Sequence, residues 1–112
     1  MKYMLMLIRS DDEWESLGEP ERDYEGIMRW WMGLAEKGVL REGGELQPAR
    51  TATTIRWDNK SPMIMDGPFM EAKESIGGYG IVEVDDLDAA IAIAKSWPAR
   101  GHKVEIRPVV AR

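Results

Sequence analysis

Lys2-Tyr3-Met4-Leu5-Met6-Leu7-Ile8-Arg9 is the stretch of sequence that decides the fold. Its length and its unbroken apolar run predict a β-strand. Both alternating faces of this strand are apolar, because one carries Tyr3, Leu5 and Leu7 and the other carries Met4, Met6 and Ile8. A strand of this kind has to be covered on both sides. One layer of helices covers only one face of a sheet, so we expect a second copy of the chain to cover the other and the protein to be a homodimer.

Two later segments carry apolar residues at helical spacing and predict helices that cover the sheet. The first spans residues 20–37, and the second begins at Asp85-Asp86 and reaches Trp97. In the first segment Trp30 and Met32 widen the apolar stripe well beyond the roughly 100° that a surface helix needs. This excess of apolar surface predicts a pocket wall or a contact between subunits.

Five further short strands are expected, at residues 40–46, 53–57, 63–65, 78–84 and 104–107. The second and third of these form a β-hairpin through the turn Asp58-Asn59-Lys60. Without this hairpin the order of elements is β-α-β-β-α-β, the split β-α-β pattern of ferredoxin-like domains. The 112 residues and the 44% hydrophobic content suffice for one core and not for two. The sequence therefore predicts one α+β domain, residues 1–112, with a ferredoxin-like arrangement and an added hairpin.

The charge and the composition exclude several classes of partner. The formal net charge of −5, without any basic tract, would repel phosphate backbones and acidic membrane surfaces, so we expect neither nucleic acid nor membrane as a partner. The apolar run 3–8 is too short for an export signal or a membrane span. The absence of cysteine excludes disulfides, thiolate zinc sites and iron–sulfur clusters, and it fits a reducing cytosol. We therefore expect a cytoplasmic protein.

The most specific motif is Asp66-Gly67-Pro68-Phe69-Met70-Glu71-Ala72-Lys73-Glu74, which is followed by Gly77-Gly78-Tyr79. It resembles the DGPF signature of the YCII-related proteins, and the segments 45–54 and 84–88 are similar to that family as well. The resemblance implies a ferredoxin-like fold that pairs face to face into a dimeric α+β barrel, with a cavity between sheet and loops in each subunit. It implies no reaction, because most members lack an assigned function. Some members are encoded near sigma factors of the extracytoplasmic-function type, which indicates a stress or regulatory setting.

Asp66 has two interpretations. Gly67 permits a positive φ, Pro68 fixes φ at about −65°, and an Asp side chain before them bonds the amides of its own turn, which favours a structural role. Alternatively, Asp66 faces a cavity as a general base or as an anchor for a polar ligand. In that case the residues expected around the ligand are Asp66, Phe69, Lys73, Tyr79, Trp30, Thr53 and Arg50. For Glu71 and Lys73 an ordinary surface ion pair is the alternative role.

The sequence predicts neither a metal nor a cofactor. The single histidine, His102, lies in a loop before the last strand, and one imidazole without a second nitrogen or sulfur ligand makes a poor metal site. We therefore expect a solvated loop histidine. Gly77-Gly78-Tyr79-Gly80 precedes a strand and does not open a helix, which is the wrong context for binding phosphates. The His–Asp pair associated with wider YCII-related proteins is not found, since the first helix carries no histidine.

Three functions are therefore open. The first is a homodimer that binds a small, partly apolar molecule in a cavity near the Asp-Gly-Pro-Phe loop. The second is a proton-transfer enzyme, of the isomerase, lyase or dehydrohalogenase type, with Asp66 as base and Lys73 or Arg50 as electrostatic support. The third is a regulatory or structural interaction protein that acts through its outer surface. The position of Asp66 relative to a cavity distinguishes the first two functions from the third.

Overall fold

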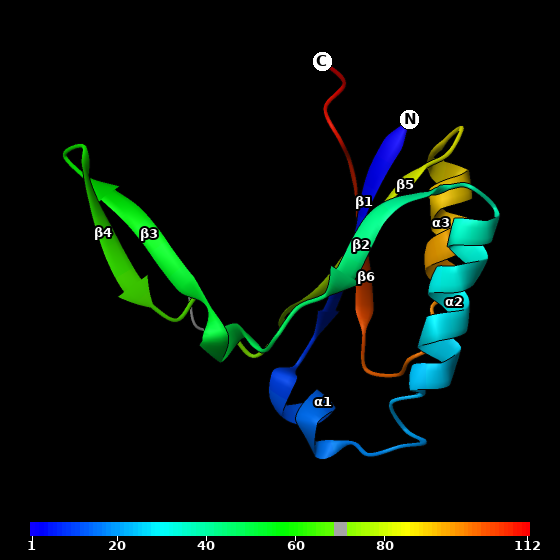
Figure 1. Cartoon of the computed structure of the whole chain (residues 1–112), viewed down its shortest axis with the longest axis horizontal. Coiled ribbons are helices and arrows are strands. Elements are labelled where there is room, and N and C mark those ends of the chain that lie inside the picture. The colour runs from blue at the N-terminus through cyan, green and yellow to red at the C-terminus, as the bar shows by residue number, and fades with distance from the viewer. Residues whose placement is uncertain (69–71) are drawn as a thin grey trace.

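This computed structural model describes residues 1–68 and 72–112, which form a four-stranded sheet, two longer helices on one face of it, and a separate two-stranded hairpin (Figure 1). The elements in chain order are β1 (Lys2–Arg9), α1 (Asp11–Ser16), α2 (Tyr24–Glu36), β2 (Leu40–Glu45), the 3-10 helix η1 (Ala49–Thr51), β3 (Thr53–Asp58), β4 (Ser61–Asp66), β5 (Ser75–Glu83), α3 (Leu87–Lys95) and β6 (Lys103–Pro108). The predicted α+β class is confirmed.

The strands of the main sheet lie in the order β2-β5-β1-β6, and every neighbouring pair is antiparallel. β1 has the bounds predicted from its apolar run and lies inside the sheet, where Leu5 is opposite Gly80 of β5 and Ile106 of β6. The register between β1 and β5 shifts after Leu7, so that Gly77 has no direct partner on β1. Such an irregularity bends a strand and makes room beside it.

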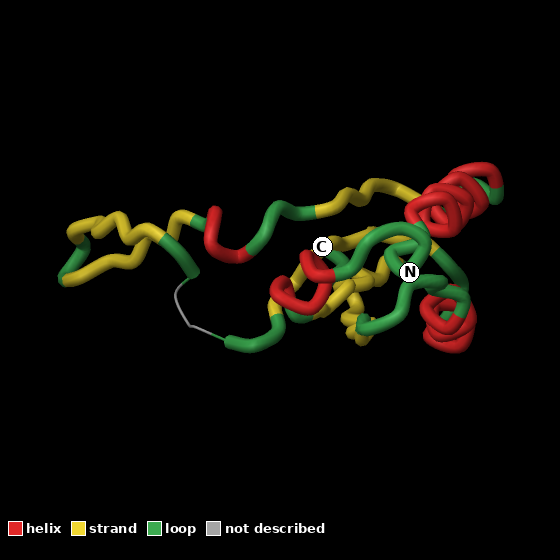
Figure 2. Tube along the Cα trace, turned by 90° about the horizontal axis from the view of Figure 1, so that it is seen from below, coloured by secondary structure: helices red, strands yellow, loops and turns green. Residues whose placement is uncertain are grey.

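The core lies between the sheet and the two longer helices. α2 and α3 both pack on one face of the sheet (Figure 2), where alternate β1 residues place Tyr3 and Leu5. Leu34 of α2, Val82 of β5 and Ala90 of α3 complete this buried cluster. Leu5 and Val82 have no exposed surface. The alternate side chains of β1 and the apolar stripes of α2 and α3 therefore form one core.

Side-chain caps begin the α-helices of the described chain. Asp23 caps α2 and Asp86 caps α3, and each carboxylate accepts a hydrogen bond from a backbone N–H of the first turn, at 3.1 and 2.9 Å. Ser10 caps α1 in the same way. The sequence did not predict α1, because six residues are too few to show an apolar period. No helix in the described part of the chain is both long and apolar enough to cross a membrane.

The opposite face of the sheet has no helix over it in the described ranges (Figures 1 and 2). It carries the other alternating residues of β1, Met4, Met6 and Ile8. Tyr79 lies opposite Met6 and Ile81 lies opposite Met4, so that β5 extends the same apolar surface. We term this surface the uncovered face. The homodimer that was expected to cover it stays a prediction.

The hairpin of β3 and β4 stands away from the rest of the chain, and we term residues 53–66 the arm. Its strands pair antiparallel from Thr53 opposite Asp66 to Asp58 opposite Ser61. Asn59 and Lys60 form the turn with φ values of 47° and 75°, as two-residue hairpin turns require. The arm projects from the side of the sheet that the helices leave free (Figures 1 and 2).

Candidate functional site

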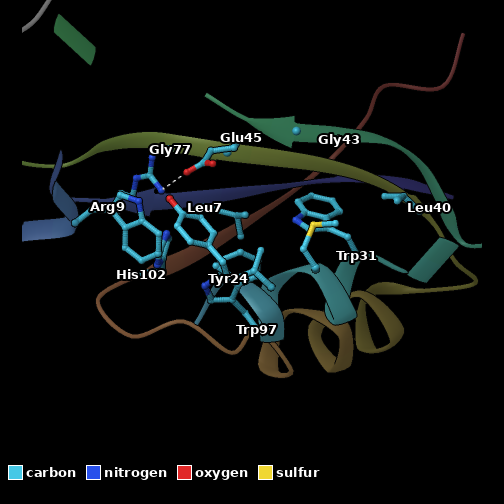
Figure 3. Close-up of a pocket in the computed structure, with 15 residues that line it drawn as sticks. Leu7, Arg9, Tyr24, Trp31, Leu40, Gly43, Glu45, Gly77, Trp97 and His102 are labelled. Carbon is cyan, nitrogen blue, oxygen red and sulfur yellow. Dashed lines mark hydrogen bonds and ion pairs between the residues drawn. The ribbon is translucent and has the colours of Figure 1, made fainter. Parts of the chain in front are cut away.

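A pocket of about 360 Å³ lies between α2 and the helix-covered face of the sheet (Figure 3). We term it the helix-side pocket. Its wall on α2 consists of Tyr24, Ile27, Met28 and Trp31, which belong to the apolar stripe of that helix. Four glycines and Leu7 contribute the surface of the sheet. Apolar and aromatic walls of this kind are typical of small-molecule sites.

Glycines allow α2 to approach the sheet closely. A Cβ atom on Gly43 would lie 2.6 Å from Trp31 Cζ3 and 2.7 Å from the backbone oxygen of Tyr79. Gly80, which is paired with Gly43, would place its Cβ 3.1 Å from the same indole ring. Trp31 therefore rests directly on backbone, and any side chain at Gly43 would displace it.

Arg9 forms the polar end of the pocket (Figure 3). It is only 6% exposed, and its Nη1 donates to Glu45 Oε2 at 3.1 Å. Its guanidinium carbon lies 4.8 Å from the centre of the Trp14 ring. A Cβ atom on Gly77 would clash with this side chain, 2.7 Å from Cζ. The irregularity of β5 at Gly77 thus makes room for a buried charge, which the Glu45 carboxylate balances.

His102 lines the same pocket as Arg9 and is half-buried, with its Nδ1 out of contact with solvent, so the expectation of a solvated loop histidine was wrong. Its ring centre is 5.0 Å from that of Trp14 and 5.2 Å from that of Trp97. Burial lowers the pKa of His102 below its ordinary value of 6.5, and the charge of Arg9 lowers it as well, against opposing effects of the Arg100 backbone and Glu45. The imidazole is therefore mostly neutral at pH 7.

Unpaired nitrogens gather at this end of the pocket. Among residues 1–68 and 72–112, three buried side-chain nitrogens have no hydrogen-bond partner: Arg9 Nε, Trp97 Nε1 and His102 Nδ1. All three belong to residues that line the helix-side pocket. Buried polar atoms are nearly always hydrogen-bonded in folded proteins, so this cluster indicates a place for a ligand or water oxygen.

The family of the chain follows from its sequence match. A sequence model of the YCII-related domain matches residues 1–111. The chain belongs to the YCII-related family. An uncharacterised protein of Rhizobium meliloti (strain 1021) is similar to it, with 32% identity over 92 residues, which cover 79% of this chain and 71% of that protein. The family predicted from the Asp-Gly-Pro-Phe motif is thus confirmed.

In this YCII-related chain the predicted site residues lie on separate surfaces. Thr53 and Asp66 are opposite each other at the base of the arm, and both are exposed. Tyr79 is on the uncovered face, opposite Met6. Trp30 faces α3, where its Nε1 donates to Ser96 Oγ at 2.8 Å. None of these predicted residues lines the helix-side pocket. The catalytic role of Asp66 stays a prediction.

The remaining predicted residues are Arg50 of η1, Lys73, and residues outside the described ranges. Arg50 of η1 donates to Glu15, and this hydrogen bond and the charge of Glu15 raise the pKa of Arg50. Lys73 is exposed. Phe69 and Glu71 lie outside the described residues. The positive φ predicted for Gly67 is confirmed at 91°.

Arg9 and His102 were not predicted as pocket residues from the sequence. Arg9 has the same parity in β1 as Leu5 and Leu7, so its side chain had to point to the helix-covered face. That parity was a usable signal for a buried charge. Nothing in the local sequence of this YCII-related chain signals that His102 packs against Trp14, because the contact joins helix α1 to a loop near the other end of the chain.

Proposed function

We propose that the chain is a homodimeric binding protein for a small, uncharged and partly apolar molecule, held in the helix-side pocket. The observation that carries this proposal is the combination of an aromatic pocket of about 360 Å³ with three unpaired buried nitrogens at one end. An apolar cavity lined by a few convergent polar groups is the usual form of a ligand site.

The charges around Arg9 favour an uncharged ligand. Glu45 lies 3.1 Å from Arg9 Nη1, and Asp11 lies 4.0 Å from Arg9 Nε. Two carboxylates thus surround one guanidinium, and neutral His102 adds no positive charge. A carboxylate or phosphate ligand beside Arg9 would be repelled by these two carboxylates, whereas a carbonyl or hydroxyl oxygen accepts a hydrogen bond without this repulsion.

The two ends of the pocket orient such a molecule. Arg9 and His102 lie at one end, and Trp31, Leu40 and Gly43 lie at the other (Figure 3). A ligand with a ring or short aliphatic body and one acceptor oxygen would place its body against Trp31 and its oxygen beside Arg9 and His102. Its binding would remove apolar ligand surface from water.

The proposal includes a ferredoxin-like subunit that pairs through its sheet. The strand order β2-β5-β1-β6, with α2 and α3 on one face, supports the ferredoxin-like arrangement. The apolar uncovered face supports face-to-face pairing of two sheets into an α+β barrel, because Met4, Ile8 and Ile81 are only half-buried in the single chain, although Met6 is buried there.

The test uses matched pairs of probes that differ in charge: acetophenone with benzoate, 1-tetralone with 1-naphthoate, and cyclohexanone with cyclohexanecarboxylate. Binding is followed through the tryptophan indole N–H signals in ¹⁵N-correlated NMR spectra. We expect the ketones to shift the signals of Trp31 and Trp97, which line the pocket, and to leave Trp57 on the arm unchanged. The carboxylates should bind at least about tenfold more weakly, a difference of roughly 1.4 kcal/mol.

Ile27→Phe enlarges a pocket-wall residue and should weaken ketone binding at least about tenfold. Met32→Phe enlarges a half-exposed residue of the same helix outside the pocket and should bind like the wild type. If no ketone shifts Trp31 or Trp97, or if Ile27→Phe binds as the wild type does, the pocket is not the site. Tighter binding of the carboxylates would leave the pocket in place and refute the uncharged ligand.

A further inference from the structure

The two faces of the arm differ in chemistry. Across the hairpin, Ile55 is opposite Ile64 and Trp57 is opposite Pro62, so these four residues share one face, which we term the Ile-Trp face. In the single chain Ile55 is 49%, Trp57 68% and Ile64 75% exposed. Large apolar side chains that share a face at this exposure mark a contact surface.

The arm also lacks the support that a hairpin needs. An isolated two-stranded hairpin is at best marginally stable in water and requires further strands or a packed surface. The radius of gyration of the chain is 15.9 Å, whereas a compact domain of this length has about 13 Å. The chain is thus more extended than a self-sufficient domain, and the arm causes the excess (Figure 1).

We propose that the Ile-Trp face packs against a second copy of this chain, which lies between the arm and the uncovered face of the first. This inference rests on the proposed homodimer and identifies the segment that holds it together. The figures show that the arm projects from the same side of the sheet as the uncovered face (Figures 1 and 2). A second copy placed against the uncovered face therefore also lies beside the arm.

A second copy fits this space better than an unrelated protein, because each copy offers both surfaces. In a two-fold dimer the same patch serves both subunits, so each arm would reach across to the other copy and both uncovered faces would be buried at once. No third surface is needed to cover the apolar residues of the arm and of the sheet.

The charge of the arm supports contact between two acidic copies. The whole chain has a formal net charge of −5, whereas the arm carries two basic residues, Arg56 and Lys60, and two acidic ones, Asp58 and Asp66, and is neutral. Like charges across an interface oppose association. A neutral, apolar arm therefore approaches an acidic partner without the repulsion that the rest of the surface would cause.

Two neighbouring residues of β4 provide a matched pair of variants. Ile64→Lys places a charge on the Ile-Trp face, and Met63→Lys places the same charge on the opposite face beside Arg56. Sedimentation velocity over a concentration series should show a wild-type dimer at micromolar concentration. Ile64→Lys should raise the Kd of the dimer at least about thirtyfold, the effect of a hot-spot residue, and Met63→Lys less than about threefold. Circular dichroism controls for folding, and equal effects of the two variants would refute the Ile-Trp face as the contact.

The wild-type chain supplies a second measurement through Trp57. Its indole is 68% exposed in the single chain, so its N–H should exchange rapidly with water on dilution and become protected as the dimer forms. A dimer in which Trp57 stays in rapid exchange would refute the arm contact and leave the proposed homodimer standing. A monomer at every concentration would refute both.

Discussion

The sheet with its helices and the arm are built from similar antiparallel strands and have opposite surroundings. In the sheet, Leu5 and Val82 are fully buried, and even the charged Arg9 is only 6% exposed. Every residue of the arm, 53–66, is exposed or half-buried. Apolar side chains thus form the core in one region and an open surface in the other. Strand pairing is therefore a local property, whereas burial depends on the surface against which a strand packs.

The two regions also use small residues differently. In the sheet with its helices, which we term the body, Gly43, Gly77 and Gly80 let side chains approach the sheet backbone closely. The arm has no glycine between Thr53 and Asp66, and its Ile and Trp side chains project into open space. The helix-covered side of the sheet is therefore closely packed within one chain, whereas the apolar side chains of the arm contact no such layer.

Filling the close contact between α2 and the sheet should change stability more than any of the other proposed substitutions. Gly43→Ala should lower the free energy of unfolding by about 2 kcal/mol, because the added Cβ meets the Trp31 ring and the backbone oxygen of Tyr79. Gly33→Ala on α2 is the control, since a Cβ there has no atom within 4 Å, and it should not lower the free energy of unfolding. Chemical denaturation at one fixed protein concentration measures both. Equal stability of the two variants would contradict the close packing of α2 on the sheet.

Local sequence patterns predicted the elements of both regions and not their relation in space. The apolar run of β1 gave the correct bounds, and the turn Asp58-Asn59-Lys60 correctly placed the tip of the arm. These features depend on residues that are neighbours in the chain. The short helix α1 escaped prediction, although Ser10 before three acidic residues is a capping signal.

The pocket was not predicted, because its residues come from segments that are far apart in the chain. Arg9 and His102 stand near opposite ends of the sequence and meet only after β1 and β6 have paired. The Asp-Gly-Pro-Phe motif identified the family and drew attention to Asp66, which lies on the arm. The motif therefore identified the family of the chain but did not indicate where the pocket lies.

A smaller loss of stability is expected when a negative charge is removed beside the pocket than when the sheet contact is filled, and removal of a charge on the arm should matter least. Glu45→Gln keeps the shape of the side chain and removes the nearer of the two carboxylates beside the buried Arg9, leaving Asp11 at 4.0 Å. We expect the free energy of unfolding to fall by about 1 kcal/mol, a modest amount because half of the Glu45 side chain faces solvent. Asp58→Asn on the exposed arm should change it by less than about 0.5 kcal/mol. A stability loss for Asp58→Asn as large as that for Glu45→Gln would remove the distinction between body and arm.

The smallest effect is a pH dependence that arises in the body through His102. Burial lowers its pKa in the folded chain below 6.5, the value in the unfolded chain, so the unfolded state binds more protons as pH falls. Above about pH 7 both states are neutral at this residue and it adds no pH dependence. The free energy of unfolding should therefore decline as pH falls from about 7 to 5.5, before most carboxylates titrate.

His102→Gln removes the titrating group and should flatten the stability of the chain over the same pH range. Ketone binding to the wild type should weaken over the same range as pH falls. A protonated His102 would place a second positive charge beside Arg9, and a bound ketone would remove water from both charges. The two measurements are urea denaturation and NMR titration at matched pH values. If the decline persists in His102→Gln, other groups cause it. An equal decline in the wild type and in His102→Gln would show that folding does not lower the pKa of His102.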